Sequence, residues 1–291
     1  MDSVVCTIDL SPADRPVVDW AAMIAQRLKA QLCLFHAIHT PSDSLHPTAE
    51  CERGGKLHRL REECRAAMAR LMAGVEAPCC SEIVFGEPVE AIEAYCRNQS
   101  VALIVAGSHG IRGFKRLMVG TVVARMARVV PCPMLVVPVK GGRADGIGRL
   151  GICCDLTAQT PQLMTAAAGL ARAFNSEVCL LHAMAVPLAP ESAEPEGATY
   201  SEVQQTMMAR VQEQLMAMVP FPLYADIAVA THLVRGEAQE HIAELAAEAR
   251  IDILVVGVRR HSAIGRWVVG STTEAALRKA ACPVLTVPLE P

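Results

Sequence analysis

The stretch Leu103–Thr121 reads LIVAGSHGIRGFKRLMVGT, and the fold is best inferred from it. It opens with an uninterrupted aliphatic run, Leu103–Ala106, which is typical of a parallel strand buried on both faces. Three glycines follow, and an apolar-periodic segment resumes at Leu117. Glycines let backbone N–H groups approach a phosphate, and a helix start adds unpaired donors. The stretch therefore predicts a strand, an anion-binding loop and a helix that begins near Gly120-Thr121.

The composition favours a core of small aliphatic side chains covered by helices. The chain of 291 residues is 52% hydrophobic but only 3% aromatic. This mixture suits helices on both faces of a parallel sheet, and the length suits two domains. The net charge of −3, with no basic block, argues against nucleic-acid binding. With neither a signal peptide nor a run long enough to span a bilayer, we expect a soluble, cytoplasmic protein.

Twelve cysteines raise the question of a metal site or of disulfides. No C-x-x-C pattern occurs, and the vicinal pairs Cys79-Cys80 and Cys153-Cys154 are poorly arranged for disulfides. Most of the others lie in apolar runs, where reduced cysteine behaves as a small hydrophobic residue. We therefore expect packing cysteines, with a redox role of Cys51 or Cys64 as the open alternative.

The sequence repeats itself, so that features of the first half have counterparts in the second. Val84–Ile92 (VFGEPVEAI) aligns with Val234–Ile242 (VRGEAQEHI). The other aligned pairs are Asp9 with Asp155, His36 with His182, Gly107 with Gly257, Gly120-Thr121 with Gly270-Ser271, and Cys132-Pro133 with Cys282-Pro283. An internal repeat of this length indicates a duplicated domain.

Each half alternates strand-like with helix-like segments, which favours right-handed βαβ crossovers and a mostly parallel, doubly wound sheet. We place the first domain at residues 1–139, a Gly-rich linker at 140–148 and the second domain at 149–291. The elements expected in the first domain are strands 4–10, 31–38, 81–86, 101–107 and 133–139 and helices 13–30, 50–73, 88–98 and 117–129. In the second domain a proline-rich loop, 187–197, precedes a helix at 200–218.

The spacing Gly107-x2-Gly110-x9-Gly120-Thr121 resembles the G-x2-G-x9-G-[ST] nucleotide-binding motif of the universal stress protein family. The Asp that ends the first strand, the His near the end of the second and the Gly-Glu step after the third agree with this family in both halves. A P-loop would need Gly-Lys-Ser/Thr, which neither half has, and a clean G-x-G-x-x-G is also missing. The chain thus looks similar to a tandem universal stress protein.

The resemblance implies two adenine nucleotide alpha hydrolase-like domains, each with a five-stranded parallel sheet of order 3-2-1-4-5. Strands one and four then flank the switch point at which open α/β sheets bind ligands. The family implies ATP or AMP as the ligand, with Mg²⁺ or Mn²⁺ beside Asp9 as a secondary expectation. The nucleotide-binding residues implied in the first half are Thr7, Asp9, Ala37, Ala106, Gly107, Gly110, Gly120, Thr121 and Val122.

The second half departs from the motif, because Arg260 stands where the first half has Gly110. If that position needs a left-handed backbone or a close approach, arginine strains or fills the site. We therefore expect the N-terminal half to hold the nucleotide. The residues of a second candidate site are Asp155, Ala183, Gly257, Arg260, Gly270 and Ser271, and Arg259 or His261 are alternative side-chain contacts to a phosphate.

Other polar residues carry weaker hypotheses. His36 and His182 are expected to be structural, whereas His109, Lys115 and Arg116 either meet a phosphate or are simply exposed. No Ser-His-Asp order and no carboxylate pair spaced for acid–base work stands out. The leading hypothesis is therefore a nucleotide-binding regulator in stress adaptation, with at most slow ATP hydrolysis.

Two rival functions stay open: a weak ATPase or adenylate-transferring enzyme, and an interaction protein whose pockets are vestigial. In the family the final strand pairs between subunits. We therefore expect the halves to dock through strands 134–139 and 284–289 as an internal pseudo-dimer, and a homodimer of the whole chain is a further option.

Overall fold

The computed structural model describes residues 2–39, 55–108, 120–139, 145–184, 200–261 and 266–289. The elements of the first half are β1 (Ser3–Thr7), α1 (Asp14–Leu28), β2 (Gln31–Ile38), α3 (Lys56–Met72), β3 (Cys79–Phe85), α4 (Pro88–Asn98), β4 (Val101–Gly107), α5 (Thr121–Met126) and β5 (Met134–Val137). Those of the second half are β6 (Arg149–Cys153), α6 (Thr160–Phe174), β7 (Glu177–Met184), α7 (Tyr200–Ala217), β8 (Val229–Arg235), α8 (Ala238–Glu248), β9 (Ile253–His261), β10 (Arg266–Val268), α9 (Ser271–Lys279) and β11 (Val284–Leu289).

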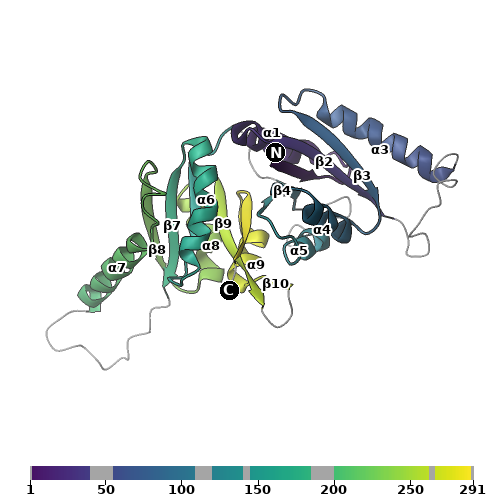
Figure 1. Cartoon of the computed structure of the whole chain (residues 1–291). Helices are drawn as coiled ribbons and strands as arrows, with labels where there is room; N and C mark the ends of the chain where they lie inside the picture. Colours follow the sequence, from purple (N-terminus) through teal and green to yellow (C-terminus); the bar gives the residue numbers. More distant parts are fainter. Residues whose placement is uncertain are drawn as a thin grey trace.

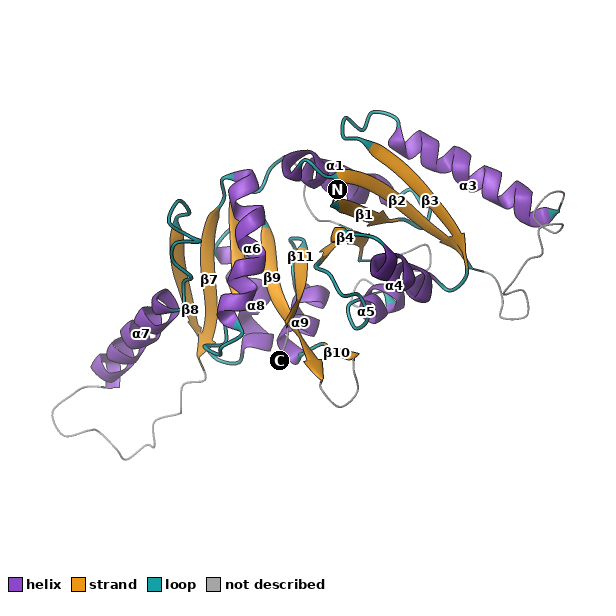
Figure 2. Cartoon of the chain, viewed as in Figure 1, coloured by secondary structure: helices purple, strands orange, loops and turns teal. Residues whose placement is uncertain are grey.

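The strands of the described residues form one continuous, mostly parallel sheet (Figures 1 and 2). Its order is β3-β2-β1-β4-β5-β11-β9-β6-β7-β8, and β10 pairs with β9 outside this path. The first half therefore has the order 3-2-1-4-5, and the second half repeats it in mirror sequence along the sheet. The α/β fold class and the doubly wound strand order expected from the sequence are confirmed.

The two halves meet through their last strands. β5 pairs with β11 antiparallel, with Leu135 opposite Leu285, and the Thr286 hydroxyl donates to the Met134 carbonyl at 3.2 Å. Either strand alone would be an apolar sheet edge with unpaired backbone groups. Pairing within one chain satisfies both edges, which places the ends of the two halves at the centre of the sheet.

Helices cover the sheet on both faces. One hydrophobic cluster runs through both halves and combines residues of α1, α3, α6 and α7 with one face of the strands. On the opposite face the halves have separate clusters, under α4 and α5 in the first and under α8 and α9 in the second. α3 and α7 lie at opposite ends of the molecule, each beside an outermost strand (Figure 1).

The element boundaries follow local chemistry. The predicted elements 31–38, 88–98 and 101–107 are confirmed, whereas the predicted strand 133–139 is shorter, because Pro133 and Pro138 flank β5. The predicted helix 117–129 is also wrong in extent: α5 is only Thr121–Met126. Residues 50–54, 109–119, 140–144 and 187–197 lie outside the described part, and with them most of the predicted linker and the proline-rich loop.

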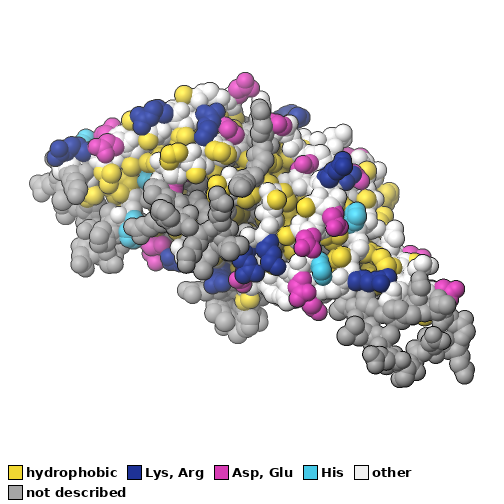
Figure 3. Space-filling model, turned by 180° about the vertical axis from the view of Figure 1, so that it is seen from behind, with side chains coloured by type: hydrophobic (Ala, Val, Ile, Leu, Met, Phe, Trp, Pro, Cys, Tyr) yellow, Lys and Arg dark blue, Asp and Glu magenta, His cyan; other side chains and the backbone are white. Residues whose placement is uncertain are grey.

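The surface carries charges of both signs. Acidic and basic side chains are intermixed over the face seen in Figure 3, in keeping with the nearly balanced net charge of −3. None of the helices in the described ranges combines the length and the apolar character needed to cross a membrane.

Candidate functional site

In the first half, β1 and β4 are neighbours and their carboxyl ends share one edge of the sheet. Thr7 is the register partner of Ala106, and its hydroxyl donates to the Val105 carbonyl at 3.5 Å. Gly120, which follows the glycine-rich stretch, also lies at this edge: its N–H donates to the Ser108 carbonyl at 2.9 Å. The first turn of α5 therefore lies beside the end of β4.

The other predicted site residues of this half come from the same edge. Asp9 follows β1, Ala37 and Gly107 lie near the carboxyl ends of β2 and β4, and Thr121 and Val122 open α5. Four elements thus converge at the switch point of the strand order, as a ligand site of an open α/β sheet requires. Gly110 lies outside the described residues, and so do His109, Lys115 and Arg116.

A buried carboxyl that the sequence did not single out supports the turn after β1. Asp14 accepts hydrogen bonds from the N–H groups of Asp9 at 3.4 Å and Ser11 at 3.0 Å. Burial, followed by the nearby charge of Asp9, raises the pKa of Asp14 from 3.8 to about 7. The corresponding residue of the second half is Thr160, so only the first half has a second carboxyl here.

Glu87 links α4 and α5, the two helices that cover one face of the first half of the sheet. Its carboxylate caps α4 by accepting from the Val89 and Glu90 N–H groups at 2.9 and 3.2 Å, and it pairs with Arg125 of α5 at 2.8 Å. This contact ties α5, the helix that follows the glycine-rich stretch, to the preceding helix α4. The Gly-Glu step that recurs in both halves of the sequence is the signal that could have indicated a role for Glu87.

The two histidines aligned by the repeat make the same contact. Nδ1 of His36 lies 2.9 Å from the Ile8 carbonyl, and Nδ1 of His182 lies 2.7 Å from the Cys154 carbonyl. Each imidazole joins the end of one strand to the end of its neighbour. These contacts support the structural role expected from the sequence.

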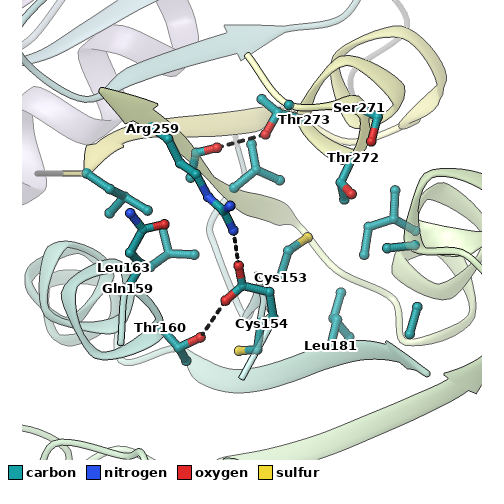
Figure 4. A pocket seen from close by; sticks show the side chains of 18 of the residues that line it. Cys153, Cys154, Gln159, Thr160, Leu163, Leu181, Arg259, Ser271, Thr272 and Thr273 are labelled. Carbon is teal, nitrogen blue, oxygen red and sulfur yellow. Dashed lines mark hydrogen bonds and ion pairs between the residues drawn. The ribbon is translucent and has the colours of Figure 1, made fainter. Parts of the chain in front are cut away.

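The second half contains a well-formed cavity of about 530 Å³ at the corresponding edge, within the size range of small-molecule sites (Figure 4). Five of the six predicted second-site residues line it: Asp155, Ala183, Gly257, Gly270 and Ser271. A Cβ added to Gly270 would meet no atom within 4 Å, so the start of α9 is open toward a ligand.

Asp155 is already engaged in this cavity. Its Oδ1 accepts from the Thr157 N–H at 3.1 Å, the Thr157 hydroxyl at 2.6 Å and the Thr160 hydroxyl at 3.4 Å. Its Oδ2 pairs with the guanidinium of Arg259, which reaches across from the end of β9 (Figure 4). Burial disfavours the charged carboxylate, but the Thr157 bonds and Arg259 outweigh it, so the pKa of Asp155 lies below its usual value.

The second half has an antiparallel strand pair at the position that aligns with the glycine-rich stretch of the first half. β9 continues through Arg260 to His261 and folds back on β10, with Arg260 opposite Trp267. Arg260 therefore lies in extended backbone, where an arginine meets none of the strain expected for a left-handed position. Gly257 serves packing, because a Cβ there would lie 2.4 Å from Cδ1 of Leu289.

Cysteines and metal-binding groups add no further site within the part of the chain that the structure describes. Every cysteine there is free, and most are buried in the apolar clusters. Those same residues contain no group of three or more His, Cys, Asp or Glu side chains able to hold a metal ion.

The fold defines a duplicated, doubly wound α/β protein, in which the same edge of the sheet recurs in each half. A sequence profile of the universal stress protein family matches residues 1–138 and again residues 146–288, so the chain belongs to this family as a tandem member. The universal stress protein YxiE of Bacillus subtilis is 28% identical over 149 residues, which cover 47% of this chain and 98% of that protein.

Solved structures share the architecture of the whole chain. A universal stress protein from Archaeoglobus fulgidus has a TM-score of 0.70 at 15% identity, covering 98% of both chains. A putative universal stress protein from Pseudomonas aeruginosa has a TM-score of 0.64 at 16% identity, covering 99% of this chain and 94% of that one. The likeness concerns the fold, and it extends over both halves.

Proposed function

We propose that the chain is an adenine-nucleotide-binding regulatory protein of the stress response, and that its N-terminal half holds the nucleotide, ATP or AMP. One observation carries the proposal: the ends of β1 and β4 and the start of α5 converge at the switch point, closed by the bond from Gly120 to Ser108. The motif glycines Gly107 and Gly120 stand at the end of β4 and directly before α5. Membership of the universal stress protein family supports the link to stress.

In this proposal the backbone does most of the binding. The glycines at 107, 110 and 120 let the backbone come close to the phosphates, which meet the hydroxyl of Thr121 and the first N–H groups of α5, where the helix start favours negative charge. The Gly120 N–H itself stays bonded to the Ser108 carbonyl. Asp9 accepts from the ribose, and the backbone of Ala37 meets adenine. The remaining walls are Thr7, Ala106 and Val122.

The wider proposal keeps the expected domains, residues 1–139 and 149–291, and a cytoplasmic location. Free cysteines in every described position agree with a reducing compartment. A Mg²⁺ or Mn²⁺ ion bound with ATP would take phosphate oxygens, with Asp9 as its carboxylate ligand from the protein.

The experiment compares the same substitution in both halves. Gly120→Asp places a carboxylate at the start of α5 and should weaken ATP and AMP binding by at least about tenfold, because like charges repel at this range. The matched control is Gly270→Asp, which should leave the tight binding intact. Equilibrium dialysis gives the affinity and stoichiometry, and circular dichroism checks the fold.

The outcomes separate the rival functions. Equal loss in both variants, or two equivalent tight sites per chain, would contradict the assignment to the N-terminal half. If neither ATP nor AMP binds to the purified chain, the interaction-protein hypothesis replaces nucleotide binding. Multiple turnovers of labelled ATP that depend on Asp9 would instead favour an ATPase.

A further inference from the structure

The second-half cavity differs chemically from its counterpart in two places. Arg259 aligns with His109 of the first half, and Thr160 aligns with Asp14. The second half therefore has a permanent cation where the first half has a histidine, and it has no second carboxyl at this edge of the sheet. Both features favour an anion in the second-half cavity.

Asp155 has little capacity left for a sugar. A carboxylate offers about four acceptor positions. Three donors crowd Oδ1 and the Arg259 guanidinium takes one side of Oδ2, which leaves about one position for a further donor, whereas a ribose diol presents two hydroxyls. A ribose diol that enters the cavity must displace one of them, which removes the advantage that a free carboxylate gives a nucleoside.

Arg259 has donors to spare. A guanidinium carries five N–H donors, and it binds phosphate in a two-pronged geometry. The side chains of Arg259 and Asp155 are 59% and 44% exposed, and an ion pair so exposed contributes only about 0–1 kcal/mol. A multiply charged anion can therefore replace Asp155 at Arg259 at small cost.

The far wall of the cavity supplies further donors. The hydroxyls of Ser271 and Thr272 lie in the first turn of α9, and they line the same cavity as Arg259 (Figure 4). The open space at Gly270 leaves the backbone there accessible. A chain of phosphates between Arg259 and this wall would meet donors at both ends.

We propose that the second-half cavity is a polyphosphate-selective site, in which Arg259 recognises the anion and Asp155 holds Arg259 in place until the anion arrives. On binding, the Arg259 guanidinium exchanges the Asp155 carboxylate for phosphate oxygens. Asp155 keeps its bonds to Thr157 and Thr160. The ligand class is inorganic polyphosphate, bound through its phosphate oxygens without a nucleoside.

The test uses the full chain with Gly120→Asp present, so that the first-half site does not contribute, and inorganic tripolyphosphate as the probe. Arg259→Gln should weaken tripolyphosphate binding by at least about tenfold. Asp155→Asn should tighten it by about twofold to fivefold, because Arg259 no longer has a competing carboxylate. The matched control is Arg278→Gln, which removes an exposed arginine of α9 outside the cavity and should change little.

Calorimetry with tripolyphosphate and with adenosine separates the outcomes. Binding of tripolyphosphate without adenosine, with opposite effects of the two substitutions, supports the proposal. It is overturned if tripolyphosphate does not bind, if Arg259→Gln binds it normally, or if adenosine binds equally well. Loss of ATP binding on Gly120→Asp is read separately and concerns only the first half.

Discussion

At the scale of single residues, the two halves use the same edge of the sheet with different charges. Asp14 is buried beside Asp9 in the first half, whereas the aligned Thr160 donates to Asp155 in the second. The turn after β1 therefore contains a carboxyl with a raised pKa, whereas the pKa of Asp155 in the turn after β6 is lowered. The second half instead has the ion pair between Asp155 and Arg259.

The raised pKa of Asp14 predicts how stability depends on pH. Between about pH 4 and pH 7 the folded chain keeps a proton that the unfolded chain has released, because the pKa is about 7 when folded and 3.8 otherwise. The contribution of Asp14 to the free energy of unfolding therefore falls as the pH rises through this window, by up to about 4 kcal/mol.

Asp14→Asn should remove this component. The variant should lose the decline between pH 4 and pH 7 relative to the wild type, as measured by urea denaturation at a series of pH values. Thr160→Ser, which adds no ionisable group, serves as the control. An unchanged pH profile in Asp14→Asn would show that Asp14 does not titrate in this window.

At the scale of elements, the helix after the third strand is held differently in the two halves. Glu87 caps α4 with its side chain, whereas Glu237, at the aligned position before α8, makes no such side-chain bond. The position of Arg125 is taken by Ala275 in the second half. The same Gly-Glu sequence therefore precedes a helix capped by the glutamate side chain in the first half and a helix without this cap in the second.

Replacing each glutamate by alanine tests this difference. Glu87→Ala should destabilise the chain by about 1–2 kcal/mol, because a cap and an ion pair are lost. Glu237→Ala should cost less than about 0.5 kcal/mol, since a surface change without such a feature has little effect. The measurement is urea denaturation of both variants. Equal losses would contradict the structural distinction.

At the scale of the whole molecule, the halves share one sheet and one large hydrophobic cluster. Leu135 of β5 and Leu285 of β11 are register partners and are both buried. α1 and α6 also contact each other on the shared face. A substitution that destabilises the pairing of β5 with β11 should therefore lower the stability of both halves.

Leu135→Ala should cost about 2–5 kcal/mol and increase hydrogen exchange in β5 and β11 together. The matched change is Leu245→Ala in α8, whose cluster belongs to the second half alone, and it should increase exchange there without affecting β1 and β2. If Leu135→Ala increases hydrogen exchange in the first half alone, the pairing of β5 with β11 does not couple the stability of the two halves.

The sequence by itself determined the duplication and the alternation of strands and helices, whereas the strand order and the candidate site residues were expected from the resemblance to the family. Aliphatic runs, glycine steps and aligned aspartates are local or repeated patterns, and such patterns report on strands, turns and topology. The lengths of β5 and α5 were less well predicted: prolines flank β5 on both sides, and α5 begins only after Gly120 and ends at Met126.

Only the tertiary structure decided which charges meet. Asp155 and Arg259 are far apart in the sequence, and nothing local indicates that β9 carries Arg259 to the end of β6. The raised pKa of Asp14 likewise depends on its burial in the folded chain. The pairing of β5 with β11 likewise forms only when both halves are folded. Interactions across distant strands depend on packing, and packing is not encoded in any single stretch of residues.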